Sequence, residues 1–453
     1  SCILMIIVLF FIPSILNNGK LNVKSDDLSQ INSEIRDLHV SKIYGKIYIN
    51  NNWSDAKAVG ICTGSGNYSD PYVIEDLVID AGGLGSCIWI VNSSAFFKIE
   101  NCTLYNSRQA TLPPWPMQAG IVLENASNGW ITQNNISYND LGILVEGENI
   151  TISANIISKN IWGIGVGWSS YISENNISKN MIGIIGGGGV ISLNNINNNI
   201  IGIYKPEYSS YSTIIENTIN NNEKAGILLE TSFNNIISKN EVSNNKLHGI
   251  WITMRTYWWD PDPYPFPGYN LITENSIKNN SYGINLNYTT DNSIFNNTVN
   301  NNEVSGVELH ISYSNTISYN NLTGNYHGIK CNESRLNQIN ENMISNNYYG
   351  VSLISSDKNN IVQNSINYNH YGISFTSSIR NEIISNVLHY NWMCFIEDQD
   401  SYYNNFENND CIETRKKGQD WIEPLLITTT ITTPLLGLAI IIILYRRYKR
   451  RLK

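Results

Sequence analysis

The chain has 453 residues, of which 42% are hydrophobic and only 15% are charged, and 70 of them are Asn. The net charge of −9 includes six cations in the last eight residues, which leaves −15 for the rest of the chain. An acidic body repels phosphate backbones, so nucleic acid is not an expected partner. A disordered, Asn-rich chain is also disfavoured, because these Asn alternate with Ile, Val and Leu at a fixed spacing.

The chain begins with an apolar run from Ile3 to Ile12. This run is too short for a comfortable membrane span and has the length of the apolar region of a signal peptide. We therefore predict a signal-peptide-like segment over residues 1–17, truncated because the usual basic stretch is missing, with a buried strand or helix as the alternative. Residues 18–42 are interpreted as a linker.

Residues 43–411 carry a repeat of about 22 residues. The motif N-x-[ILV]-x-x-N occurs in twelve consecutive units, and a Gly-Ile or Gly-Val step usually follows it. This period suits one coil of three short strands, whose inward apolar residues are buried only when coils stack. We predict an all-β, right-handed parallel β-helix of about 14 coils, with Asn side chains bonded in ladders between coils. We assign the left-handed backbone of the turns to these Asn and Gly residues.

Two insertions interrupt the repeat, at residues 107–119 and 254–269. Loops on a solenoid usually carry its function, and exposed aromatic rings stack on sugars. We predict a glycan-binding corner with the following aromatic residues: Trp115, Tyr208, Tyr211, Phe233, Tyr257, Trp258, Trp259 and Tyr264. The candidates for catalysis are Arg255, Asp260 and Asp262, although no third group is evident. The alternative is a self-packed flap of Pro and aromatic residues with solvated carboxylates.

The cysteines and acidic residues give weaker signals. Cys394 and Cys411 are the first pair to test for a disulfide, with buried free thiols as the alternative. No CxxC or CxxH spacing occurs, so we predict no metal site and no cofactor. An acidic stretch from Glu397 to Asp410 is interpreted as a polar cap of the solenoid, and calcium is left open as its ligand.

The C-terminal end predicts a membrane anchor. After a linker at residues 412–424, no residue from 425 to 445 is charged, and 21 helical residues span about 31 Å, which matches a bilayer core. The basic tail, residues 446–453, should be cytoplasmic and the β-helix outside the cell.

The motif G-I-x-L, followed by S-x-x-N-x-I-x-x-N, resembles the right-handed parallel β-helix repeat proteins, in particular their NosD-like and carbohydrate-binding or sugar-hydrolase group. Residues 356–361 show the serine form, residues 64–75 are similar to the opening coil, and the resemblance covers about residues 43–411. It implies the fold but leaves the function open, because the superfamily mixes lyases, hydrolases, adhesins and binders.

Three functions are therefore weighed. The first is a cell-surface protein that binds an extracellular or cell-wall glycan, and the second is a polysaccharide lyase or glycoside hydrolase with a site near residues 254–269. The third is an envelope or adhesion component without a small ligand. The resemblance to NosD also raises maturation of a copper site, which the scattered His residues disfavour. The sequence does not indicate the oligomeric state.

Overall fold

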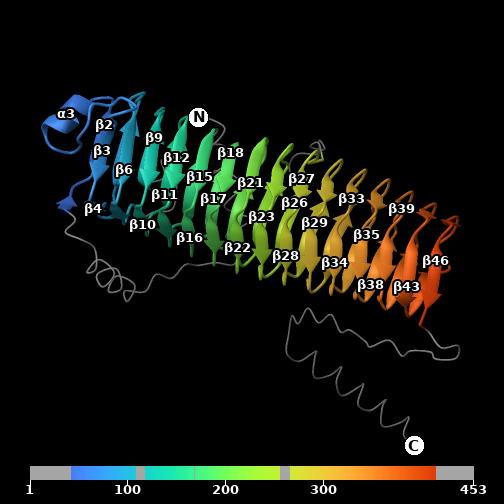
Figure 1. Ribbon diagram of the computed structural model, residues 1–453. Coiled ribbons are helices and arrows are strands. Elements are labelled where there is room, and N and C mark those ends of the chain that lie inside the picture. Colours follow the sequence, from blue (N-terminus) through green and yellow to red (C-terminus); the bar gives the residue numbers. More distant parts are fainter. Residues whose placement is uncertain (1–41, 109–117, 168, 256–265, 415–453) are drawn as a thin grey trace, which may run out of the picture. The chain divides into compact units, whose positions relative to one another are not determined.

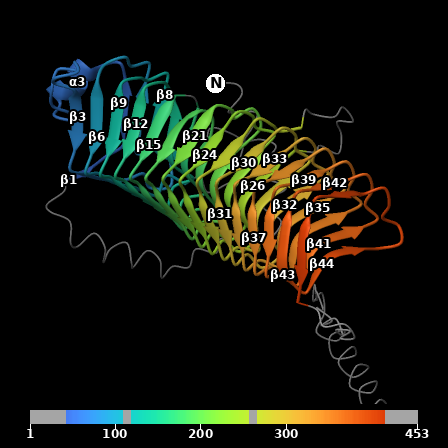
Figure 2. The ribbon, with the colours of Figure 1, turned by 45° about the vertical axis from the view of Figure 1, so that its right-hand side comes forward.

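A computed structural model describes residues 42–108, 118–167, 169–255 and 266–414. Its strands form three parallel sheets, here called A, B and C, and each turn of the chain adds one strand to each sheet in that order (Figure 1). This arrangement is the predicted parallel β-helix. Figure 2 shows the three sheets as the faces of one continuous solenoid.

The strands of sheet A are β1 (Lys42–Tyr44), β4 (Leu77–Asp80), β7 (Thr103–Tyr105), β10 (Asn135–Ser137), β13 (Ile156–Ser158), β16 (Asn176–Ser178), β19 (Asn195–Asn197), β22 (Thr218–Asn220), β25 (Glu241–Ser243), β28 (Ser276–Lys278), β31 (Thr298–Asn300), β34 (Asn321–Thr323), β37 (Met343–Ser345), β40 (Ser365–Asn367), β43 (Val387–Asn391) and β46 (Asp410–Glu413).

The strands of sheet B are β2 (Ile47–Asn50), β5 (Ile88–Val91), β8 (Ala119–Glu124), β11 (Leu141–Glu146), β14 (Trp162–Val166), β17 (Ile182–Gly186), β20 (Ile201–Lys205), β23 (Ala225–Glu230), β26 (His248–Thr253), β29 (Tyr282–Asn287), β32 (Ser305–His310), β35 (His327–Asn332), β38 (Tyr349–Ile354), β41 (Tyr371–Thr376) and β44 (Met393–Glu397).

The strands of sheet C are β3 (Tyr72–Glu75), β6 (Phe97–Glu100), β9 (Gly129–Thr132), β12 (Ile150–Ser153), β15 (Ser170–Ser173), β18 (Gly189–Ser192), β21 (Ser212–Ile215), β24 (Ile236–Ser238), β27 (Leu271–Thr273), β30 (Ser293–Phe295), β33 (Thr316–Ser318), β36 (Gln338–Asn340), β39 (Asn360–Val362), β42 (Glu382–Ile384) and β45 (Asn405–Glu407).

The core is the aliphatic interior between the three sheets. Ile317, Ile339 and Ile361 occupy the same position in successive strands of sheet C and are fully buried. Apolar residues alternate with polar ones along each short strand, so the inward set is sealed only by stacking turn on turn. The solenoid has about 15 turns rather than the predicted 14, because β1, β2 and β3 form a complete turn before Cys87.

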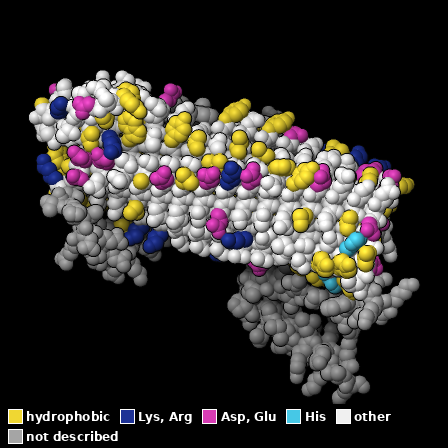
Figure 3. Space-filling model, viewed as in Figure 1, with side chains coloured by type: hydrophobic (Ala, Val, Ile, Leu, Met, Phe, Trp, Pro, Cys, Tyr) yellow, Lys and Arg dark blue, Asp and Glu magenta, His cyan; other side chains and the backbone are white. Residues whose placement is uncertain are grey.

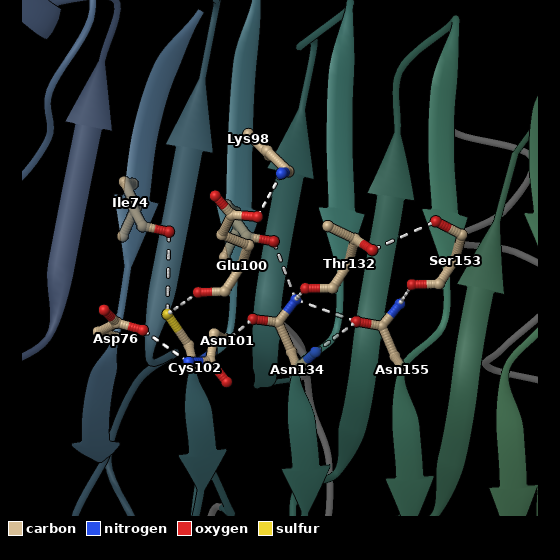
Figure 4. A network of polar contacts seen from close by, with 11 residues as sticks. Ile74, Asp76, Lys98, Glu100, Asn101, Cys102, Thr132, Asn134, Ser153 and Asn155 are labelled. Atoms are coloured by element: carbon tan, nitrogen blue, oxygen red, sulfur yellow. Dashed lines mark hydrogen bonds and ion pairs between the residues drawn. The ribbon is translucent and has the colours of Figure 1, made fainter. Parts of the chain in front are cut away.

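Buried Asn side chains link the turns in ladders, as predicted. In one ladder the Nδ2 of Asn134 donates to the Oδ1 of Asn155 at 3.0 Å (Figure 4). The Nδ2 of Asn155 donates in turn to the Oδ1 of Asn175 at 2.9 Å. The backbone N–H of Asn155 also donates to the Oδ1 of Asn175, at 2.9 Å. Each amide therefore pairs with the next turn through both its side chain and its backbone, which fixes the register of the stack.

The predicted assignment of left-handed backbone was wrong for the ladder Asn and for the glycines of the Gly-Ile steps, although other Asn residues, such as Asn296 and Asn301, do adopt it. The positive φ angles fall on the residue before the ladder Asn, which is Glu174 at φ 58° and Leu193 at φ 56° in two of the turns. None of the glycines in the Gly-Ile steps has a positive φ. They are needed for a different reason, since a Cβ at Gly142 would lie 2.4 Å from the carbonyl oxygen of Gly163 on the next turn.

The two ends of the solenoid are closed differently. At the N-terminal end, α3 (Trp53–Ala58) places the Trp53 ring against that of Tyr72, with centroids 4.8 Å apart. At the C-terminal end Cys394 and Cys411 form a disulfide, which confirms that pair. Both ends thus cover a core that would otherwise be open to water.

Candidate functional site

The turns that join each sheet B strand to the following sheet C strand form one edge of the solenoid, here called the BC corner. Tyr208 and Tyr211 protrude from this corner, with 53% and 74% of their surface exposed. Both have a positive φ, and their N–H groups donate to the carbonyl oxygens of Thr231 and Phe233 on the next turn, each at 3.2 Å. The turn-to-turn bonds therefore hold two exposed rings on a fixed backbone.

Further rings continue along the BC corner toward the C-terminal end. The Phe266 ring lies 6.5 Å from that of Tyr288 in a stacked arrangement and 5.7 Å from that of Tyr313 in an edge-on one. The guanidinium of Arg335 lies over the Tyr313 ring at 4.7 Å from its centroid. Aromatic side chains thus occupy this corner on several successive turns.

A polar pair of one buried and one partly buried residue lies on the outer face of sheet B beside the corner. The Tyr204 hydroxyl of β20 donates a short hydrogen bond to the Oε2 of Glu230, the last residue of β23. Burial raises the pKa of Glu230, and it outweighs the bond from Tyr204 and the positive charges of Arg255 and Lys224, which lower the pKa. Glu207, also buried, adds repulsion that raises it. The carboxyl of Glu230 therefore holds its proton to a higher pH than an exposed Glu.

A cation and stacked rings border the same face. The Nζ of Lys224 lies 5.5 Å from the centroid of the Trp251 ring, and the His248 ring stacks between Trp251, at 4.6 Å, and Tyr282, at 5.0 Å. Burial, followed by the charge of Lys224, lowers the pKa of His248 to about 4, so this ring is uncharged at neutral pH. This group thus offers a ligand one cation, one neutral imidazole and two aromatic rings.

The outer face of sheet B is apolar toward the N-terminal end of the solenoid and becomes partly polar toward the C-terminal end. From β8 to β23 two of its outward rows are apolar and form one cluster, which contains Ala119, Val122, Leu141, Trp162, Ile182, Ile185, Ile201, Tyr204, Ala225 and Leu228. From β29 onward one of these rows becomes polar, with Asn285, Glu308 and Lys330. The Tyr204–Glu230 pair thus lies near the boundary between the apolar and the polar parts.

A lysine occupies a core position in β20. Lys205 pairs with Leu229 of the next turn, and its Nζ donates to the carbonyl oxygen of Gly187 at 2.6 Å. The equivalent position on the preceding turn is Gly186, where a φ of 127° and the close approach of the Val166 backbone exclude a side chain. Burial lowers the pKa of Lys205 to about 7.

The structure brings together part of the predicted site. Tyr208, Tyr211 and Phe233 share the BC corner with Arg255, whose N–H donates to the Thr231 hydroxyl at 2.8 Å. The other predicted residues lie outside the described residues: Trp115, Tyr257, Trp258, Trp259, Asp260, Asp262 and Tyr264.

Sequence reasoning missed Tyr204, Lys205, Glu230, Lys224 and Trp251. One signal was present, because Lys205 breaks the motif G-I-x-L by placing a cation where an aliphatic residue is expected.

Comparisons with known proteins support the fold. The family model of the periplasmic copper-binding protein NosD matches residues 267–433, and that of the right handed beta helix region matches residues 47–195 and 86–258. No curated protein matches the chain.

Several solved structures are similar to this chain. The A-module of the Azotobacter vinelandii mannuronan C-5 epimerase AlgE4 is 14% identical, with a TM-score of 0.50 over 80% of this chain and 100% of that one. The periplasmic alginate epimerase AlgG is 15% identical, with a TM-score of 0.45 over 86% and 96%. Tailspike protein 3 of bacteriophage CBA120 is 11% identical, with a TM-score of 0.41 over 86% and 64%. At these identities the likeness shows the fold alone, although both epimerases act by name on a polysaccharide.

No helix among the described residues is long and apolar enough to cross a membrane. The predicted span at residues 425–445 and the signal-like segment at residues 1–17 lie outside these residues and stay predictions.

Proposed function

Because this chain is a NosD-like right-handed parallel β-helix repeat protein, we propose that it binds a glycan along the BC corner, at the surface of the cell. The observation that carries the proposal is the pair of exposed rings, Tyr208 and Tyr211, next to the partly buried Tyr204–Glu230 pair. Rings supply stacking surfaces for the apolar faces of sugars, and the polar pair supplies directed hydrogen bonds to hydroxyl groups.

The solenoid suits an extended ligand. Neighbouring turns are separated by about 4.8 Å, which is close to the length of one sugar unit in a chain. Side chains repeated at the corner would therefore meet successive units of one polysaccharide. Since the turns are fixed by buried Asn ladders, little freedom is lost on binding.

The charge of the chain favours an uncharged glycan. The part of the chain before the basic tail carries a net charge of −15, which opposes long-range approach of a polyanion. At the corner the acids Glu207 and Glu230 are matched by Arg255 and Lys224. We therefore choose neutral polysaccharides as the first ligands to test.

The test is isothermal titration of the purified full chain with soluble neutral β-glucans. The double substitution Tyr208→Ala/Tyr211→Ala should weaken binding about tenfold, since the loss of two stacking contacts is worth about 1.4 kcal/mol or more. Tyr319→Ala is the matched control, because Tyr319 is similarly exposed, at 51%, but lies on a different edge. Equal affinity of the double variant and the parent would refute the proposed site, and so would equal loss in the control.

A second candidate is hydrolysis or lyase chemistry at the same place. It is favoured by Glu230, whose raised pKa suits a carboxyl group that must give up a proton to a leaving oxygen. Glu207 and Arg255 would then supply a second carboxylate and a cation. Release of reducing ends or unsaturated products by the parent, abolished by Glu230→Gln with binding retained, would establish catalysis. Unchanged turnover in Glu230→Gln would reject this role.

Copper handling, which the name of the matching family describes, does not fit the described residues. Their one group of three close His, Cys, Asp or Glu ligand atoms is Cys394, Cys411 and Glu413, and its two sulfurs are joined in the disulfide. His327 and His370 stack on tyrosine rings in different rows. We therefore derive no step through copper, and calcium binding by the acidic cap stays a prediction.

The acidic residues of this cap make protein contacts. Asp398 accepts hydrogen bonds from the Ser377 N–H at 3.0 Å and the Ser401 hydroxyl at 2.6 Å, and Asp410 pairs with His389 at 2.7 Å. These contacts support the proposal that the acidic stretch serves as a polar cover for the last turn.

A further inference from the structure

Aromatic rings gather on a second edge of the solenoid, near its C-terminal end. This edge, here called the AB corner, is formed by the turns that join each sheet A strand to the following sheet B strand. One row of stacked rings runs along it through Tyr326, Tyr348, His370 and Trp392, with successive centroids 5.0, 4.7 and 4.7 Å apart. The spacing is that of the turns themselves, so the rings follow the axis of the solenoid.

A second row lies directly beside the first. The rings of His327, Tyr349 and Tyr371 stack at 4.9 and 5.2 Å, and His370 meets Tyr371 edge-on at 4.5 Å. Figure 3 shows hydrophobic and His side chains gathered at the right-hand, C-terminal end of the described solenoid.

A third pair of rings is the most exposed part of this edge. Tyr368 and Tyr390 stack at 5.0 Å, with 58% and 47% of their surface exposed. Each precedes a residue of the first row by two positions, at the end of its sheet A strand. We call the three rows together the aromatic strip.

The geometry of the strip is poor for sugars. Its rings are turned face to face along the axis, so the flat surfaces on which a sugar would stack are occupied by neighbouring rings. The parts of the rings that are left to contact a partner are their edges and the polar ends of Tyr and Trp. The strip therefore differs in kind from the BC corner.

The strip is also uncharged at neutral pH. Burial lowers the pKa of His327 to about 3 and also lowers that of His370. The nearest positive charge in sheet B is Lys330, which makes the pKa of His327 lower still and is paired with Glu308 at 3.0 Å. An uncharged band of Tyr, Trp and neutral His has the composition that proteins place at the boundary between lipid and water.

We propose that the aromatic strip rests in the headgroup region of a membrane, a proposal that rests on the predicted anchor at residues 425–445. The described solenoid ends at Thr414, and the predicted span begins at residue 425. Were that predicted span inserted in a bilayer, ten residues could separate it from the solenoid by at most about 35 Å, which favours a lipid surface as the partner of this end. An edge of amphipathic rings at that end would hold the solenoid on the surface, whereas a polar edge would leave it free to swing.

The test uses the full chain reconstituted in lipid vesicles. The substitution Tyr390→Cys, labelled with an environment-sensitive fluorophore, reports on the strip, and Tyr319→Cys reports on an edge without it. Buried Cys87, Cys102 and Cys331 have thiol pKa values raised to about 12 and resist labelling. The unsubstituted chain, labelled in parallel, corrects for any other cysteine.

Lipids that carry a nitroxide near the headgroup should quench the label in Tyr390→Cys at least about twofold, and the label in Tyr319→Cys much less. Equal quenching at the two positions, or none at either, would overturn the proposal. A signal from Tyr390→Cys that depends on the density of protein in the vesicle rather than on the nitroxide lipid would also overturn it, because the strip would then join two copies of the chain.

Discussion

The Asn ladder gives the sharpest prediction, at Asn320. Its Nδ2 donates to the carbonyl oxygens of Ile294 and Ser318 at 2.9 and 3.0 Å and to the Oδ1 of Asn342 at 3.0 Å. Its Oδ1 accepts from the backbone and the side chain of Asn297, at 2.9 and 3.0 Å. The Nδ2 has two hydrogens to share among its three contacts, so Asn320→Ala removes about four full buried bonds, each worth about 0.5–1.5 kcal/mol net, and leaves partners without a bond. We expect a loss of at least about 3 kcal/mol in the free energy of unfolding.

The control is the adjacent residue, Asn321, which is exposed on β34. Asn321→Ala should change the free energy of unfolding by no more than about 0.5 kcal/mol. Urea titration followed by circular dichroism measures both variants, and hydrogen exchange shows where the stack opens. Because each turn contacts only its neighbours, the faster exchange should be centred on the turns that hold Asn297 and Asn342. If Asn320→Ala is as stable as Asn321→Ala, the ladder does not hold the turns together and the reasoning is wrong.

Three further changes test other parts of the scaffold. Gly142→Ala puts a Cβ within 2.4 Å of a carbonyl oxygen and should lower the unfolding free energy by about 1–3 kcal/mol, whereas Gly45→Ala, with open space around it, should be neutral in the same thermal melt. Burial lowers the pKa of Lys205 from 10.5 to about 7. Between these two pH values the unfolded chain binds more protons than the folded chain, so the free energy of unfolding should rise with pH. Urea titrations should show this slope in the parent and not in Lys205→Met. Cys411→Ser opens the disulfide to Cys394, and hydrogen exchange should speed up in the last turns only; faster exchange in the central turns would contradict the nearest-neighbour view.

The sequence was sufficient to predict the scaffold because stacking constrains side chains directly. A buried amide must meet another amide one turn away, so Asn recurs at fixed spacing, and the interior is filled mostly by aliphatic residues such as Ile317. The left-handed position could not be predicted in this way. Asn occupies it in many turns, but so do Glu174, Leu193 and Tyr319, because the requirement falls on the backbone.

The site was harder to predict because its residues stand at ordinary positions of the repeat. Glu230 ends β23 just as Glu124 ends β8. Nothing in the amino-acid sequence shows that Tyr204 lies within hydrogen-bonding distance of Glu230. Register decides this contact, since the two residues lie on adjacent strands at outward positions. The insertion at residues 254–269 indicated this part of the solenoid, but that Tyr204 and Glu230 lie beside it follows only from the fold.

The exceptions to the repeat are not spread evenly, and this distribution bears on function. Gly186 replaces an inward aliphatic residue, Lys205 takes the same row one turn later, and Arg255 is buried after β26, while Glu230, at an ordinary position of the repeat, is partly buried beside Tyr204. All four lie at the BC end of neighbouring sheet B strands, where each exception weakens the core or buries a charge. A solenoid stabilised turn by turn tolerates such a region only because the turns on either side keep the full set of amide and aliphatic contacts. These four adjacent turns give up stability at one corner, while the other turns keep theirs. Such a local loss is expected where the side chains bind a ligand instead of stabilising the solenoid.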